Sequence, residues 1–175
     1  PFSDKDKIML FGENASERTL KGLDLAQFST IAFATHGLIS GELPGLTEPA
    51  LVLSSPLIRT STDDGFLTAS EISAMNFDAQ LVILSACNSY YSGDEDTSAL
   101  STLSDAFLSS GAKNLMVTHW AIESQVSVAI TTRTLSEYML APGKGLANAL
   151  REAITHVRRN DKWQHPAFWA PFSIV

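Results

Sequence analysis

The sequence contains a single cysteine among its 175 residues. One cysteine excludes an internal disulfide framework and any zinc site that needs several thiolate ligands. Clusters of lysine and arginine are also missing, and 12 basic side chains stand against 19 acidic ones, for a formal net charge of −7. Because proteins that bind nucleic acid present basic patches or stripes, no direct nucleic-acid binding is expected.

Long apolar runs are missing as well. The longest, such as residues 81–84, are far shorter than the roughly 20 residues that cross a bilayer, so no membrane segment is predicted. No signal-peptide pattern occurs at the start, because the aspartate and lysine residues there lead into no apolar segment. The chain begins with Pro1 rather than methionine. We therefore expect an excised or processed fragment of a longer, cytoplasmic protein.

The composition is that of one globular domain. Hydrophobic residues make up 45% of the sequence and charged residues 18%, and the 175 residues suit one sizeable core better than two small ones. No internal repeat and no glycine- or serine-rich linker divides the chain. We predict a single domain over residues 1–175.

Three short apolar runs indicate buried strands. These runs are residues 31–34, 81–84 and 115–117. Each is continuously hydrophobic, which is typical of strands in a parallel sheet that helices cover on both faces. Weaker signals predict a strand at 50–53, near a sheet edge or in a hairpin, and another at 168–175. In the last of these, Pro171 allows only an edge strand or a bulge.

Apolar residues at helical spacing separate these runs. A helical face is visible over residues 100–107, and Gly111 stands where a left-handed C-terminal cap belongs. Thr68 and Glu71 have the spacing of a capping box, and Ser124 can cap another helix. Helices are accordingly predicted at 68–74, 100–111, 124–139 and 146–157. The alternation predicts an α/β fold, a three-layer sandwich with a mostly parallel central sheet.

Candidate catalytic side chains follow the predicted strands. His36 comes after the first apolar run, Cys87 after the second and His119 after the third. In parallel sheets, sites form beyond the carboxyl ends of the strands. A thiol beside an imidazole is activated as a thiolate nucleophile, and histidine is suited to the role of base. Gly37 allows close approach of a substrate backbone, and its N–H with that of Cys87 suits an oxyanion hole.

Structural interpretations of these residues compete with the catalytic one. A lone cysteine at a strand end is more often a small buried hydrophobe than a nucleophile, and a lone histidine is also often structural. The acidic stretch 93–97 lacks the alternating ligand spacing of a calcium-binding loop and is expected to be solvated. Neither a metal site nor a cofactor is predicted.

Several motifs resemble the CHAT family of caspase-like peptidases. They follow the family order over nearly the whole chain. Cys87 lies 51 residues after His36 (87 − 36), and the separation in caspases is about 50. The motifs are Ala34-Thr35-His36-Gly37, Gly65-Phe66-Leu67-Thr68-Ala69-Ser70-Glu71-Ile72, Leu84-Ser85-Ala86-Cys87-Asn88-Ser89, Trp120 after a strand, Ala149-Leu150-Arg151-Glu152-Ala153 and His165-Pro166-Ala167-Phe168-Trp169-Ala170-Pro171-Phe172.

The resemblance implies a caspase–hemoglobinase fold and a His/Cys dyad that cleaves peptide bonds without a cofactor. His36 and Cys87 match the dyad, and Gly37 matches the oxyanion glycine. The family further implies a protein or peptide substrate, and regulation by upstream modules such as TPR repeats in bacterial signalling and defence proteins. By the same comparison, an early strand and helix would lie upstream of Pro1.

Substrate-binding positions depart from the family pattern. Residues 89–91 replace a Thr-Gly pair, and residues 118–120 read Thr-His-Trp where the family often has Ser-Leu-Trp. Acidic residues at 63, 64 and 94–96 favour a basic residue before the cleaved bond. The side chains expected to line the substrate pocket are Ser85, Asp94, His119 and Trp120.

The sequence thus predicts a cysteine endopeptidase that forms an acyl-enzyme. Cys87 attacks the scissile carbonyl and His36 protonates the leaving amine. Activity is expected to be latent until upstream domains or a bound effector order the substrate loops. Two alternatives are kept: a non-catalytic interaction module with the same fold, and a cysteine hydrolase that acts on small amides.

Overall fold

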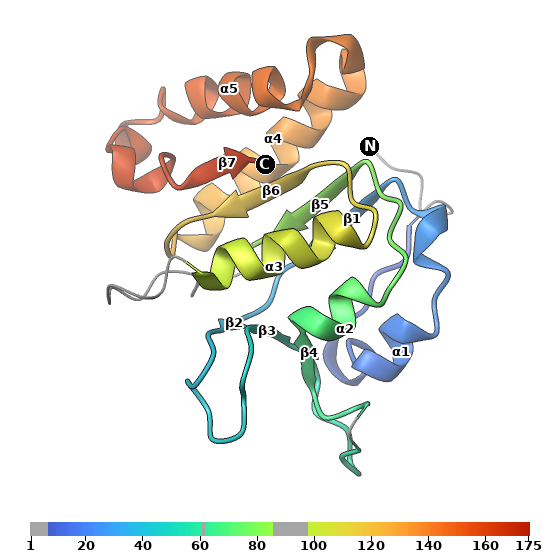
Figure 1. Cartoon of the computed structure of the whole chain (residues 1–175). Helices are drawn as coiled ribbons and strands as arrows, with labels where there is room; N and C mark the ends of the chain where they lie inside the picture. Colours follow the sequence, from blue (N-terminus) through green and yellow to red (C-terminus); the bar gives the residue numbers. More distant parts are fainter. Residues whose placement is uncertain (1–6, 61, 86–97) are drawn as a thin grey trace.

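The central feature is a four-stranded sheet in the order β1-β5-β6-β7 (Figure 1). The structure, a computed structural model, describes residues 7–60, 62–85 and 98–175. Three strands are parallel, and β7 pairs antiparallel with β6 at one edge. The strands are β1 (Thr30–Phe33), β5 (Leu81–Leu84), β6 (Leu115–Thr118) and β7 (Phe172–Ile174). The predicted α/β fold with a mostly parallel sheet is confirmed.

Helices cover both faces of this sheet and make three layers. On one face, Val82 and Leu84 of β5 join a core with residues of α1, α2 and α3, and Phe77 and Phe107 stack edge to face in it at 5.1 Å between ring centroids. On the other face, Leu81 and Ile83 pack against α4 and α5, which lie above the sheet in Figure 1. The helices are α1 (Glu17–Lys21), α2 (Ala69–Ser73), α3 (Ser98–Ser109), α4 (Ser124–Leu140) and α5 (Leu146–Val157).

Local signals in the sequence locate most helix ends correctly. Thr68 and Glu71 form the predicted capping box before α2. Gly111 follows α3 with φ of +107°, the left-handed region that favours glycine. The prediction for Ser124 was wrong by one position, because Ser124 is the first residue of α4 and Glu123 occupies the N-cap without a capping side-chain bond.

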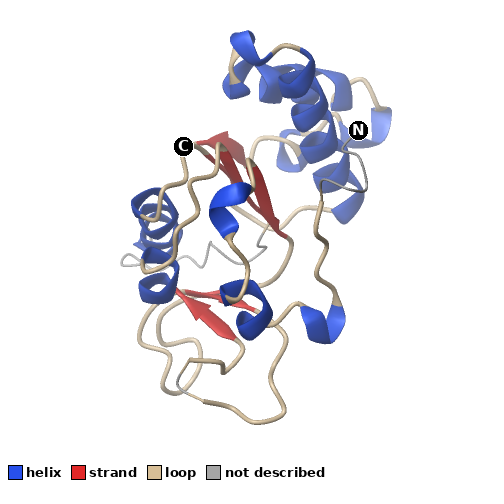
Figure 2. Cartoon of the chain, turned by 90° about the vertical axis from the view of Figure 1, so that its right-hand side faces the viewer, coloured by secondary structure: helices blue, strands red, loops and turns tan. Residues whose placement is uncertain are grey.

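A second, smaller sheet has the order β2-β3-β4 and lies apart from the first one (Figure 2). Its antiparallel strands are β2 (Gly37–Leu38), β3 (Ala50–Val52) and β4 (Phe66–Thr68). The strand predicted at 50–53 is therefore the hairpin strand β3. Short 3₁₀ helices complete the described elements: η2 (Gly12–Asn14), η3 (Leu25–Gln27), η4 (Pro142–Lys144), η5 (Asp161–Trp163) and η6 (Pro166–Phe168).

Strand β1 differs from its prediction in burial. Of its residues, only Phe33 is buried, and Ala32 is exposed. The sequence predicted a strand covered on both faces, which was wrong for β1. The reason is its place at the sheet edge, where no β1 side chain joins the core beneath α4 and α5. Within the described residues, no helix is long and apolar enough to cross a membrane.

Candidate functional site

The carboxyl ends of β1 and β5 lie side by side. Phe33 is the register partner of Leu84, and the N–H of Ser85 donates to the Phe33 carbonyl at 2.9 Å. The register offset is 51 residues (84 − 33), which equals the separation of Cys87 from His36 (87 − 36). In sequence, each predicted dyad residue is thus the third residue after the last strand pair. Cys87 itself lies outside the described residues, as does Asp94.

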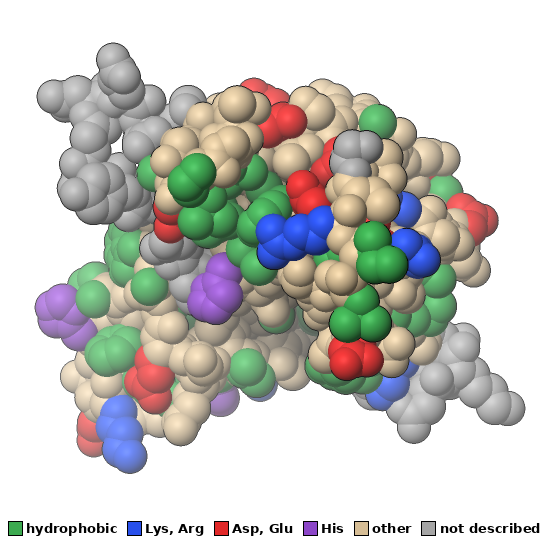
Figure 3. Space-filling model, turned by 90° about the horizontal axis from the view of Figure 1, so that it is seen from below, with side chains coloured by type: hydrophobic (Ala, Val, Ile, Leu, Met, Phe, Trp, Pro, Cys, Tyr) green, Lys and Arg blue, Asp and Glu red, His purple; other side chains and the backbone are tan. Residues whose placement is uncertain are grey.

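His36 lies in the short segment that joins β1 to the small sheet. Its carbonyl accepts from the N–H of Val52 at 2.8 Å, and the neighbouring Thr35 hydroxyl donates to the Val52 carbonyl. The His36 side chain is exposed, and histidine side chains are visible on the face seen from below in Figure 3. The backbone of this segment is thus anchored to β3 while the imidazole stays accessible.

Gly37 is buried and lies opposite Leu51 in the β2–β3 pair. Because the N–H of Val52 bonds to the His36 carbonyl, Gly37 and Leu51 form a non-hydrogen-bonded pair. The N–H of Gly37 therefore points away from β3. The pairing of β2 with β3 therefore leaves this N–H unused.

Ser85 extends β5 by one residue, and its side chain faces α4. The Ser85 hydroxyl lies 3.1 Å from the hydroxyl of Ser127 in that helix. This follows from the alternation along β5, because Leu81 and Ile83 face the same layer. Sequence reasoning missed Ser127, since a serine near the start of a polar helix carries no signal of its own.

His119 and Trp120 follow β6, and both contact the C-terminal segment. The Nε2 atom of His119 lies 2.9 Å from the Ser173 hydroxyl of β7, and the Trp120 indole donates to the Ala167 carbonyl at 3.0 Å. Trp120 keeps 40% of its surface exposed. Among the described residues, no hydrogen bond joins His36 to Ser85, His119 or Trp120.

Strand order alone does not select the base. Because β5 lies between β1 and β6, a histidine follows the neighbouring strand on each side of the strand that leads to Cys87. The contact with Ser173 distinguishes the two, since the His119 ring is held against β7. His36 has no such partner among the side chains that the structure describes.

Asp63 and Asp64, two of the acidic residues expected to favour a basic residue in the substrate, form hydrogen bonds within the protein. Asp63 is buried and its Oδ2 atom accepts from the Arg18 guanidinium at 3.0 Å. Asp64 accepts from the backbone N–H of Phe66 at 2.9 Å. The acidic candidates at 94–96 lie outside the described residues.

A buried carboxylate network, which sequence reasoning missed, supports α1, α2 and the loop before β4. Glu17 is fully buried and accepts from the Lys21 ammonium at 2.6 Å and from the backbone N–H groups of Asp64 and Gly65 at 2.7 and 2.6 Å. Lys21 also donates to Glu71 at 2.7 Å. The i, i+4 spacing of Glu17 and Lys21 was the available signal.

The network shifts the pKa values of Glu71 and Lys21 in opposite directions. Burial alone would raise the pKa of Glu71, but hydrogen bonds from Lys21 and from the Thr68 backbone outweigh it and lower that pKa. Burial alone would lower the pKa of Lys21, but hydrogen bonds to Glu17 and Glu71 raise it overall. Both groups are therefore held in their charged forms. Across the described residues, no cluster of His, Cys, Asp and Glu is placed to hold a metal ion.

Comparison with known proteins adds one finding. A family model described as the CHAT domain matches residues 2–175, nearly the whole chain. No curated protein matches the chain.

Proposed function

This chain belongs to the CHAT domain family, which includes caspase-like cysteine peptidases, and we propose that it is itself a cysteine endopeptidase acting through His36 and Cys87. The substrate is a protein, as the family implies. No cofactor takes part in this chemistry, because thiolate attack and proton transfer suffice for acyl transfer.

The register of β1 and β5 carries the proposal. The N–H of Ser85 donates to the Phe33 carbonyl, so β1 and β5 end next to each other at the same edge of the sheet. Neighbouring strands lie about 4.8 Å apart. Two peptide units separate Cys87 from Ser85, a reach of at most about 7 Å. His36 and Cys87 each follow the Phe33–Leu84 pair by three residues, a separation short enough for the thiol and the imidazole to form the proposed dyad.

The proposed reaction uses backbone as well as side-chain groups. The Cys87 thiolate adds to the scissile carbonyl, and the N–H groups of Gly37 and Cys87 hold the oxyanion. His36 then protonates the departing amine, and water hydrolyses the thioester and restores the thiol. Support for this role of Gly37 comes from its N–H, which the pairing with β3 does not use.

We further propose roles for neighbouring residues and for the chain as a whole. Ser85, Asp94, His119 and Trp120 border the substrate, with Trp120 as a wall. Residues 1–175 act as the peptidase domain of a longer cytoplasmic protein, and upstream domains or an activating partner control it. A fragment limited to these residues is then expected to turn substrate over slowly.

Substitution of Cys87 tests the proposal. Cleavage of a peptide library by the activated full-length protein is measured by mass spectrometry for the parent, for Cys87→Ala and for a Ser110→Ala control. The control removes a hydroxyl that donates to the Phe107 carbonyl at the end of α3 and, within the described residues, to no other group. We expect no cleavage by Cys87→Ala with unchanged circular dichroism, and normal cleavage by the control. Cleavage retained by Cys87→Ala rejects the mechanism.

Thiol labelling separates the enzyme from a non-catalytic module. A dyad thiolate reacts with a small alkylating agent faster than a free thiol near neutral pH, whereas a module predicts ordinary reactivity. Turnover of small amides without turnover of peptides would instead identify the hydrolase alternative.

A further inference from the structure

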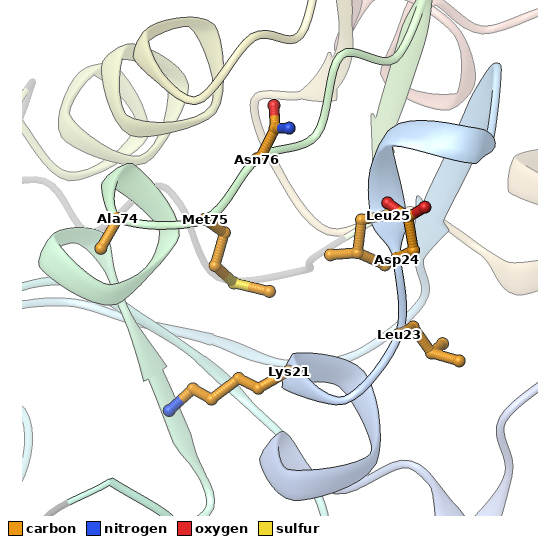
Figure 4. Close-up of a pocket in the computed structure, with 7 residues that line it drawn as sticks. All are labelled: Lys21, Leu23, Asp24, Leu25, Ala74, Met75 and Asn76. Carbon is orange, nitrogen blue, oxygen red and sulfur yellow. The ribbon is translucent and has the colours of Figure 1, made fainter.

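A cleft of about 250 Å³ opens between the end of α1, the turn η3 and the end of α2 (Figure 4). Its two walls lead into the amino-terminal ends of β1 and β5, at the opposite end of the strands from His36 and Ser85. Sites for drug-sized ligands have volumes of roughly 300–1,000 Å³. This cleft is therefore too small for a nucleotide or a similar cofactor and suits one or two side chains.

Apolar and polar side chains both line the cleft. Leu25 of η3 and Met75 after α2 point toward one another across it, while the Leu23 side chain points away from Met75 (Figure 4). Leu25 is buried, while Leu23 and Met75 are half-buried against the core of the α1–α3 face. Half-buried Met75 presents apolar surface that a bound side chain would remove from water.

All three hydrogens of the Lys21 ammonium, the cation at the cleft, are donated to groups of the protein. The Lys21 side chain runs along the cleft with its ammonium directed away from Asp24 (Figure 4). That ammonium donates to Glu17 at 2.6 Å, to Glu71 at 2.7 Å and to the Thr62 carbonyl at 2.8 Å. Since an ammonium has three hydrogens to donate, none is left for an anionic ligand.

The remaining polar groups of the cleft are acidic or neutral. Asp24 and Asn76 are exposed, and in the part of the chain that the structure describes neither side chain has a hydrogen bond or ion pair. The Lys21 ammonium is paired with Glu17 and Glu71, whereas Asp24 lies on the other side of the cleft and is the one carboxylate among the described residues that line it (Figure 4). The charge of Asp24 is unpaired within the described part of the chain, so the electrostatic potential on its side of the cleft favours a cation.

We propose that this cleft docks a segment of a partner protein in which an apolar side chain of leucine or methionine size stands next to a lysine or arginine. The apolar side chain fills the space between Leu25 and Met75, and the basic side chain pairs with Asp24. The site lies away from the dyad and does not depend on the proposed peptidase activity, because binding needs neither His36 nor Cys87.

Methyl resonances of methionine provide a direct test. The chain has four methionines, namely Met9, Met75, Met116 and Met139, and ¹³C-methyl labelling reports on each separately once Met75→Leu has identified its signal. The probe is the dipeptide acetyl-Leu-Lys-amide, added to the whole chain of 175 residues. We expect the Met75 signal to shift with saturation, while buried Met116 and the remote, half-exposed Met139 stay in place.

Matched peptides and variants decide the outcome. Acetyl-Leu-Glu-amide and acetyl-Gly-Lys-amide should each bind more weakly, because one lacks the cation and the other the apolar side chain. Asp24→Asn should raise the dissociation constant for the lysine peptide about two- to fivefold, the range for an exposed ion pair, whereas Asp105→Asn on α3 should leave it unchanged. An unshifted Met75 at about 10 mM peptide, equal effects of the lysine and glutamate peptides, or no effect of Asp24→Asn would overturn the proposal. An unmoved Met116 signal confirms the fold in each variant.

Discussion

The imidazole of His119 and the hydroxyl of Ser173 lie 2.9 Å apart across the β6–β7 pair. This contact gives His119 a structural partner, whereas His36 is exposed after β1. We predict that His36→Ala removes the enhanced reactivity of Cys87 and that His119→Ala keeps it. An ion-paired thiolate reacts well below the pKa of a free thiol, so the pH dependence of alkylation is the measurement.

The control for this prediction is Ser173→Ala. It removes the same hydrogen bond as His119→Ala, so both variants should lose a similar stability of about 1 kcal/mol without a change in the reactive pKa. A rise of that pKa in His119→Ala, with none in His36→Ala, would reverse the assignment of the base.

The ion pairs of Lys21 and Arg151 should differ sharply in their contribution to stability. Lys21→Met leaves the fully buried Glu17 without its cation, and we expect a loss of about 2–3 kcal/mol in the free energy of unfolding. This value lies at the low end for a buried pair, because the Lys21 side chain keeps 26% exposure and Glu17 keeps two backbone donors.

Arg151→Met is the matched control, since Arg151 pairs with Glu152 on the surface of α5 at 2.8 Å. Its loss should stay below about 1 kcal/mol. Urea unfolding measures both variants, and similar losses for the two would contradict the role assigned to the Glu17 network.

Stability should fall at both ends of the pH scale. The pKa of Glu71 lies below its ordinary value in the folded state, so its contribution is complete above about 4.5 and is lost as pH falls through the lowered pKa. The pKa of Lys21 lies above 10.5, so its contribution is complete below that pH and is lost as pH rises through the raised pKa.

The measurement is the free energy of unfolding from about pH 3 to about pH 11 for the parent and for Glu71→Gln. In the variant, the free energy of unfolding should decrease less as pH falls, because the carboxyl group that titrates in the parent is absent. An acid-side slope unchanged by Glu71→Gln would show that other carboxyl groups account for it.

Gly111 and Gly143 should respond oppositely to alanine. A Cβ at Gly111 would lie 3.0 Å from the Asp78 backbone nitrogen, and φ there is +107°. We expect Gly111→Ala to cost more than about 1 kcal/mol, because both the backbone conformation and the space exclude a side chain. Thermal unfolding reports the loss.

At Gly143, an added Cβ would meet no described atom within 4 Å, and the backbone there is not left-handed. Gly143→Ala should therefore be neutral or stabilising by about a few tenths of a kcal/mol. Equal destabilisation by the two substitutions would contradict the view that the conformation after α3 requires glycine.

The sequence alone determined the elements whose signals are local. Continuous apolar runs located β5 and β6, helical periodicity located α3 and α5, and Thr68 with Glu71 indicated the capping box of α2. These features depend on residues within one or two turns of each other, so a linear pattern contains them. The positions of His36 after one strand and of Cys87 after the next followed from the same runs.

Tertiary structure decided what depends on distant residues. The partner of His119 is 54 residues away, and Glu17 accepts from backbone donors that are 47 and 48 residues away. The exposure of Ala32 depends on which helices reach the sheet edge. The strands β2 and β4 have only two and three residues, too few to show a period. The cleft beside Asp24 forms only where η3 meets the end of α2. Contacts with distant backbone donors and packing neighbours produce no local pattern in the sequence, so only the folded structure shows them.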